Sequence, residues 1–169
     1  MRRPDLTPDC GSCAAICCVA TSFDASEDFA FSKAAGVPCP HVARDCRCTI
    51  HDALVARGLS GCAIYDCYGA GQRVTRAFAG RDERERNEAF LVLRVVHELL
   101  WLLTEAAKLC PSSHDELDAH LAREIEALDA IARCPTLVVD LRPHRETTHA
   151  LLRRVGHALG GRRALVVLD

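Results

Sequence analysis

Residues 10–18 read CGSCAAICC and place four cysteines, Cys10, Cys13, Cys17 and Cys18, within nine positions. Five more cysteines follow before residue 68, and these are Cys39, Cys46, Cys48, Cys62 and Cys67. Only Cys110 and Cys134 lie in the rest of the 169 residues. The cysteines therefore set the first part of the chain apart from the remainder.

Composition limits the classes of protein to which the chain can belong. The formal net charge is −2, from 21 Lys and Arg residues against 23 Asp and Glu residues, so nothing in the charge balance favours nucleic-acid binding. No apolar run approaches the ~20 residues of a membrane span, and no apolar signal segment follows the basic start. We expect a soluble cytoplasmic protein that binds neither nucleic acid nor membrane.

The cysteine pattern predicts a metal site rather than disulfides. Thiols stay reduced in the cytoplasm, and eleven cysteines cannot all pair within one chain. A Cys-x-x-Cys loop such as Cys10–Cys13 turns two thiolates toward one metal. The adjacent Cys17 and Cys18 suit a polynuclear cluster or two separate centres, because neighbouring side chains reach one tetrahedral ion together only with strain. Thiolate ligands select zinc, iron–sulfur or Cu(I).

The segment Cys10–Arg76 resembles a cysteine-cluster family with the signature CxxCxxxCC, whose members are described as zinc- or iron-chelating domains. It is similar in particular to an N-terminal domain of certain actinobacterial pentapeptide-repeat proteins. Blocks like GVPCPHV, RCTIHDALVARGLSGCAIYDC and YGAGQRVT occur there in the same order, followed by a helix like HELLWLLTEA. The resemblance extends to about Leu109, and no A(D/N)Lxx repeats follow in this sequence. It implies a metal-binding module and leaves the reaction unnamed.

The positions that match the family's cysteines are Cys10, Cys13, Cys17, Cys18, Cys39, Cys48, Cys62 and Cys67. Eight thiolates fit two four-thiolate zinc sites, two cubane clusters, or one cluster with supporting thiols. We favour an iron–sulfur cluster, with zinc as the alternative, because contiguous cysteines suit a cluster better than a single ion. Cys46 departs from the family pattern, and His41 and His51 are either ligands or partners of the ligands.

A change of composition near residue 81 predicts two regions, a cysteine-rich metal-binding lobe over 1–80 and a helical lobe over 81–169. Apolar spacing predicts helices at Asn87–Leu109, from Ser113 to about Ala132, and at about Pro143–Leu159. We expect a mainly α fold in which a loop-rich cysteine lobe packs on a two- or three-helix bundle. The runs at Thr136–Leu141 and Ala164–Asp169 are either two short strands or short pieces packed on the bundle.

Three functions are compatible with this pattern. The favoured one is a structural or redox-sensing metal centre, and the others are an iron–sulfur enzyme with an open metal site and thiolate metal storage. An open site beside His51, Tyr65 or Asp66 would favour the enzyme. No hydrolase or nucleotide-binding motif occurs, and we interpret Gly69–Gln72 as a flexible exit from the cysteine lobe. The broad apolar arc of Asn87–Leu109 is a candidate homodimer surface; a protein partner is not indicated.

Overall fold

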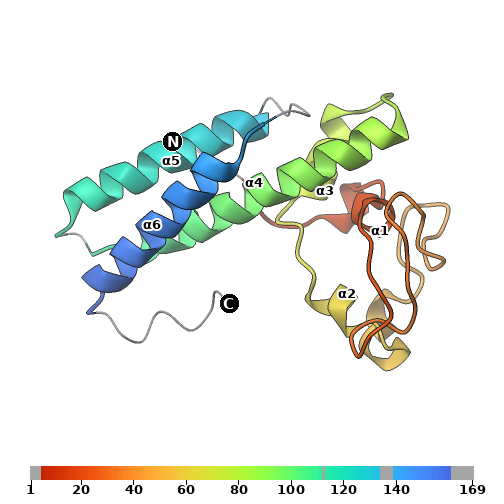
Figure 1. The fold of residues 1–169 in the computed structure, drawn as a ribbon. Helices are drawn as coiled ribbons and strands as arrows, with labels where there is room; N and C mark the ends of the chain where they lie inside the picture. Colours follow the sequence, from red (N-terminus) through yellow and green to blue (C-terminus); the bar gives the residue numbers. More distant parts are fainter. Residues whose placement is uncertain (1–4, 112, 134–138, 161–169) are drawn as a thin grey trace. The chain divides into compact units, whose positions relative to one another are not determined.

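The computed structural model describes residues 5–111, 113–133 and 139–160, and the mainly α prediction is confirmed (Figure 1). The elements run in the order η1 (Cys10–Ser12), α1 (Ile16–Ala20), η2 (His51–Ala53), η3 (Val55–Arg57), α2 (Ser60–Ile64), α3 (Ala70–Ala77), α4 (Glu83–Leu109), α5 (Asp115–Arg133) and α6 (Arg142–Ala158). Extended pairing in the described ranges is limited to two isolated antiparallel bridges, Phe23 with Lys33 and Val42 with Cys48. No helix in these ranges is long and apolar enough to cross a membrane.

The chain divides into two compact units, which we call the cysteine unit (Asp5–Arg94) and the helical unit (from Val95 onward). The division falls inside α4. The change of composition near residue 81 coincides with the beginning of this helix at Glu83. The domain boundary at residue 80 stays a prediction.

The helical unit takes its buried apolar side chains from three helices. Leu99, Leu100 and Leu103 lie on the second half of α4, and α5 and α6 pack against each other. On α5 and α6 the buried apolar residues are Leu117, Leu121, Leu128, Ala132, Leu151 and Val155. Their spacing of three to four residues, or multiples of it, gives each helix one apolar face, as expected for a helix bundle. The two runs predicted as short strands lie largely or wholly outside the described residues.

Polar contacts across α5 and α6 are few and local. His144 Nδ1 lies 2.6 Å from Glu124 Oε1, and both side chains are mostly buried. Arg154 Nη1 lies 2.7 Å from His120 Nδ1 at the surface. The apolar faces therefore provide most of the attraction between these helices.

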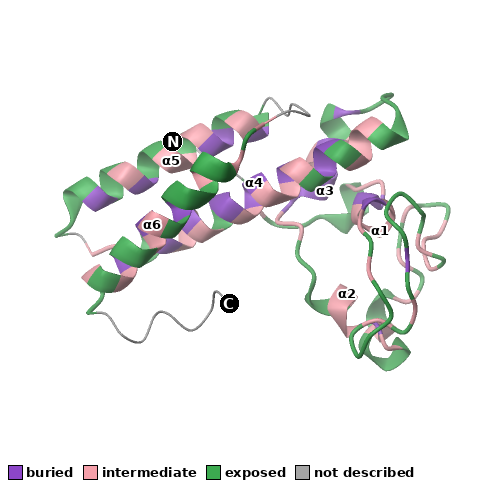
Figure 2. Cartoon of the chain, in the orientation of Figure 1, coloured by how far each residue is buried: buried purple, intermediate pink, exposed green. Residues whose placement is uncertain are grey.

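The cysteine unit is built mainly from loops and short helices before α3, and its buried apolar residues lie largely in α1, α3 and the first half of α4 (Figure 2). Within residues 21–69, all of which the structure describes, Leu59 is the one buried apolar residue, at 2% exposed. The more regular part is α3, which packs against η1 and α1. Apolar burial within residues 21–69 therefore comes from Leu59 and from the half-buried, mutually packed rings of Phe23, Phe29 and Phe31.

We expect Leu121→Ala to lower the free energy of unfolding of the helical unit by about 2 to 5 kcal/mol, because the side chain is fully buried and leaves a cavity. Leu109→Ala, at a position that is 59% exposed, serves as the control and costs less than about 0.5 kcal/mol. Urea unfolding followed by the helical circular dichroism signal measures both. Equal losses would contradict the assignment of this core.

Candidate metal centre

The Cys10–Cys13 loop is shaped by a side-chain cap. Asp9 Oδ1 accepts hydrogen bonds from the backbone N–H of Gly11 at 3.0 Å and of Ser12 at 3.2 Å. The backbone N–H of Cys13 then bonds to the carbonyl of Cys10 at 3.4 Å. Capping by Asp bends the chain into the single turn η1, so that both cysteines lie at the ends of one tight loop.

Helix α3 holds this loop from the other side. The side chain of Gln72 accepts from the N–H of Asp9 at 3.2 Å and donates to the carbonyl of Thr7 at 2.7 Å. Thr75 Oγ1 accepts from the N–H of Ala14 at 3.0 Å. A Cβ on Gly71 would lie 2.8 Å from Cys13 Sγ and 3.8 Å from Cys67 Sγ, so both sulfurs pack against this glycine.

The interpretation of Gly69–Gln72 as a flexible exit is therefore wrong. Gly69 caps the beginning of α3 with a left-handed φ of 78°, and Gln72 is buried. Two glycines close together are typical of a loop, yet here they allow a turn and a close approach of sulfur to the backbone.

Four thiols gather beside α3, and we call them the first cysteine set: Cys10, Cys13, Cys17 and Cys67. Burial raises the pKa of Cys10, and the charges of Cys67, Cys13 and, more weakly, Cys18 add to the effect. Burial also raises the pKa of Cys13, with Cys67 adding to the effect. The hydrogen bond to Cys18, burial, and the charges of Cys18, Cys13 and Cys67 raise the pKa of Cys17. These four side chains are therefore electrostatic neighbours.

Four other thiols form a second cysteine set: Cys18, Cys39, Cys48 and Cys62. The backbone N–H of Cys39 bonds to the carbonyl of Cys18 at 3.0 Å, and Cys48 pairs with Val42 in one of the two bridges. Burial, followed by Cys18, Cys39 and Cys48, raises the pKa of Cys62. Burial likewise raises the pKa of Cys39, which also feels Cys18 and Cys48.

The two sets meet at the adjacent cysteines. Cys17 Sγ and Cys18 Sγ lie 3.9 Å apart. A hydrogen bond between the two thiols, in which either sulfur can be the donor, lowers the pKa of Cys18 to about 7. Cys18 interacts with Cys39 and Cys62 of the second set, so the dipeptide provides one thiol to each set.

Backbone N–H groups point at one sulfur of each set. The N–H groups of Ala15 and Ile16 lower the pKa of Cys13 against the larger effect of burial, and the N–H of His41 does the same for Cys39. Ala15 adopts a left-handed φ of 52°, which aims this backbone at the sulfur. Hydrogen bonds of this kind favour the thiolate over the thiol, and thiolate is the form that binds metal.

The eight predicted cysteines are thus gathered in one unit, but they do not form a closed coordination sphere. Among the described residues, no three Cys, His, Asp or Glu side chains are arranged so that they could hold a metal ion. The eight sulfurs are electrostatic neighbours within each set rather than ready-made ligands.

The cysteines and histidines outside the predicted set of eight ligands have different surroundings. Cys46 has a left-handed φ of 64° in a turn closed by the N–H of Ala43 and the carbonyl of Arg47. His51 is exposed and lies beside Asp52, whereas the His41 ring packs edge-on against Phe31 at 5.9 Å. Cys110 belongs to the helical unit, and Cys134 lies outside the described residues.

Two polar residues near the proposed open site have structural contacts instead. Asp66 Oδ1 accepts the backbone N–H of Tyr68 at 2.6 Å and shapes the turn after Cys67. The guanidinium of Arg94 lies 5.7 Å from the centre of the Tyr65 ring. Burial raises the pKa of Tyr65 above its usual range, so Tyr65 stays neutral at physiological pH.

Sequence reasoning missed Lys33, which is buried beside the second cysteine set. Burial lowers the pKa of Lys33, and the charges of Cys39, Cys18, Cys17 and Cys62, in that order of strength, oppose this shift. The sequence did contain a hint that Lys33 is unusual. Lys33 and Lys108 are the two lysines of a chain in which arginine supplies nearly all of the positive charge. The aromatic neighbours of Lys33 also form a cluster, with the Phe23 and Phe29 rings stacked at 4.3 Å.

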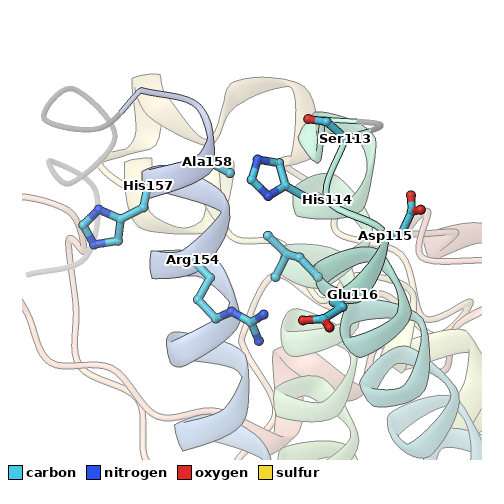
Figure 3. A pocket seen from close by; sticks show the side chains of 8 residues that line it. Ser113, His114, Asp115, Glu116, Arg154, His157 and Ala158 are labelled. Carbon is cyan, nitrogen blue, oxygen red and sulfur yellow. The ribbon is translucent and has the colours of Figure 1, made fainter.

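A surface pocket of 640 Å³ lies in the helical unit (Figure 3). The residues that line it are Ser113, His114, Asp115, Glu116, Leu117, Arg154, His157 and Ala158. Side chains of both charges, Glu116 and Arg154 among them, reach into it from α5 and α6. It contains none of the predicted ligands, and this mixed lining selects no class of ligand.

Comparison with known proteins gives one informative similarity. The chain is 35% identical over 151 residues to the uncharacterized protein YybG of Bacillus subtilis (strain 168). The match covers 83% of this chain and 54% of the relative, so the chain spans about half the length of the curated protein it matches. No family model matches the chain. No solved structure matches it either.

We expect Gly61→Ala to disturb the helix that carries Cys62. A Cβ on Gly61 would clash with the ring of Phe29, which stacks on Phe23, so α2 has to move at a cost of about 1 to 3 kcal/mol. The measurement is the rate at which a thiol reagent modifies Cys62 in the chain as purified without oxygen, and this rate rises. Phe29→Leu in the same chain removes the clash and restores part of the protection; a Gly61→Ala rate equal to that of the wild type would refute the contact.

Proposed function

We propose that the cysteine unit is a metal-binding module with two four-thiolate centres, one formed by each cysteine set, whose role is structural or redox-sensing. The observation that carries the proposal is that the eight predicted cysteines interact electrostatically within one unit, mostly in two groups of four, with Cys18 also acting on Cys10 and Cys17. The Cys17–Cys18 dipeptide joins the groups and supplies one ligand to each. Rotation of the cysteine side chains is needed to close each sphere.

The scarcity of a core in residues 21–69 supports a structural role for the metal. With Leu59 as the one buried apolar side chain of this segment, hydrophobic burial leaves most of the ordering entropy without compensation. Metal binding supplies such free energy in small domains whose ligands converge only in the folded state. Protons held by the thiols, whose pKa values in Cys10, Cys13, Cys39 and Cys62 are raised mainly by burial, are released when metal binds.

Four thiolates for each centre favour a closed site over an enzyme. Structural zinc sites use four protein ligands, whereas catalytic sites keep one position open for water or substrate. His51, Tyr65 and Asp66, which would line an open site, make the contacts described above. The enzyme hypothesis therefore has no observation in its favour.

Both an iron–sulfur cluster and zinc fit a set of four thiolates. The contiguous cysteines favoured a cluster because a single ion cannot easily bind both of them. Because Cys17 and Cys18 belong to different sets, no single ion has to bind both of them. The preference for a cluster therefore disappears, and zinc fits each set as well. Measurement of the bound metal therefore distinguishes zinc from an iron–sulfur cluster.

We expect the full chain, purified without oxygen, to contain about two zinc ions or about eight iron atoms with a similar amount of sulfide. Cys13→Ser removes a ligand from the first set and Cys39→Ser removes one from the second, so each variant loses about half of the metal and the double variant loses all of it. Elemental analysis and the visible spectrum give the count and the identity.

Cys46→Ser and Cys110→Ser are the matched controls, and both retain the wild-type metal content. Loss of all metal in either single-set variant would show one shared centre instead of two. A wild-type chain that folds fully without metal would refute the proposed function.

A further inference from the structure

Lys33 is a buried charge in a segment, residues 21–69, that has few buried side chains. Its side chain is 7% exposed, although lysine is almost never buried without a partner. The ammonium donates to the carbonyls of Val19 at 3.1 Å, Ala34 at 3.2 Å and Val37 at 2.9 Å, and also to the carbonyl of Thr21. These four carbonyls come from the end of α1 and from the chain that leads to Cys39, so Lys33 ties these two segments together.

Neutral carbonyls satisfy the N–H groups of an ammonium but carry no opposite charge. The groups whose thiolate form favours the Lys33 ammonium are Cys39, Cys18, Cys17 and Cys62, and all but Cys17 belong to the second cysteine set. Lys33 in turn lowers the pKa of Cys18, after the larger effect of the Cys17 hydrogen bond. For Cys10 and Cys13 of the first set, the interactions are with other thiols, with Asp9, and with nearby backbone and hydroxyl groups.

A four-thiolate centre with bound metal carries a net negative charge, which a nearby buried cation offsets. Four thiolates around one divalent ion leave a net charge of about −2. A partly buried charge of this kind is costly unless it is paired. One ammonium among the loops of the second cysteine set reduces the formal net charge there from about −2 to about −1.

We propose that Lys33 is the counter-ion and positioning residue of the second cysteine set. Its ammonium holds the loops that carry Cys18 and Cys39 and offsets the negative charge of the filled centre, so the two centres differ in charge. This inference rests on the proposed function.

The test uses the full chain, stripped of metal and titrated with Co²⁺ without oxygen. A Cys13→Ser background isolates the second set, and a Cys39→Ser background isolates the first. In the Cys13→Ser background, Lys33→Met weakens Co²⁺ binding by about 10- to 100-fold, the effect typical of losing a partner of a metal ligand. In the Cys39→Ser background it changes the affinity by less than about threefold, and Lys108→Met changes neither set.

The spectrum separates an effect of charge from an effect of structure alone. A nearby cation stabilises the sulfur lone pairs, so its removal shifts the sulfur-to-cobalt charge-transfer band of the second set to lower energy. A loss of affinity without this shift, or equal losses in both backgrounds, would overturn the proposal. If Lys33→Met does not fold, Lys33→Gln keeps N–H donors for the carbonyls without the charge; the same shift is expected, and an unshifted band would overturn the proposal.

The outcomes also distinguish this proposal from the one on which it rests. A wild-type chain that binds no Co²⁺ refutes the metal-binding function itself. A wild-type chain that binds two Co²⁺ ions, together with a Lys33→Met chain that binds them equally well, refutes only the role of Lys33.

Discussion

Crowded thiols are the constraint on which the cysteine unit depends. Eight of them lie in two groups within a unit whose residues 21–69 contain a single buried apolar residue, Leu59. The pKa values of Cys10, Cys13, Cys39 and Cys62 are raised by burial and by neighbouring thiols. Sulfurs that lie close together resist ionisation in the metal-free chain. When a metal cation binds them as thiolates, the same closeness stabilises the folded unit.

The local structures around the sulfurs serve this arrangement. Asp9 shapes the first loop, and Gln72 fixes that loop against α3. The second set depends on longer links, from the Cys39 N–H to the Cys18 carbonyl and from Lys33 to four carbonyls. The first set is thus supported by a helix, and the second by loops that meet around a buried ammonium.

Local sequence patterns predicted the helices well and the grouping of the cysteines poorly. The apolar spacing at Asn87–Leu109 predicted most of α4, because the period of a helix is visible in a continuous segment. The mixed-charge run before Asn87 also joins this helix, since charged side chains remain in solvent there. Which cysteines become neighbours depends instead on contacts between distant segments, such as Cys13 and Cys67 on either side of Gly71.

Two residues show why the rest of the site was not predictable. Glycines at 69 and 71 are typical of loops. In the structure Gly69 begins α3 with a left-handed φ, and Gly71 leaves room for the sulfurs of Cys13 and Cys67. A lysine is expected at the surface, and the carbonyls that bury Lys33 come from backbone whose path no local pattern specifies. Cys46, which departs from the family pattern, lies in a turn with a left-handed φ.

The central claim is that metal orders the cysteine unit. Hydrogen–deuterium exchange of the full chain, followed by mass spectrometry before and after removal of metal with a chelator, tests it most directly. The account predicts that metal removal abolishes protection across residues 10–70 while α5 and α6 keep theirs. Unchanged protection across residues 10–70 in a chain shown to be metal-free would contradict it.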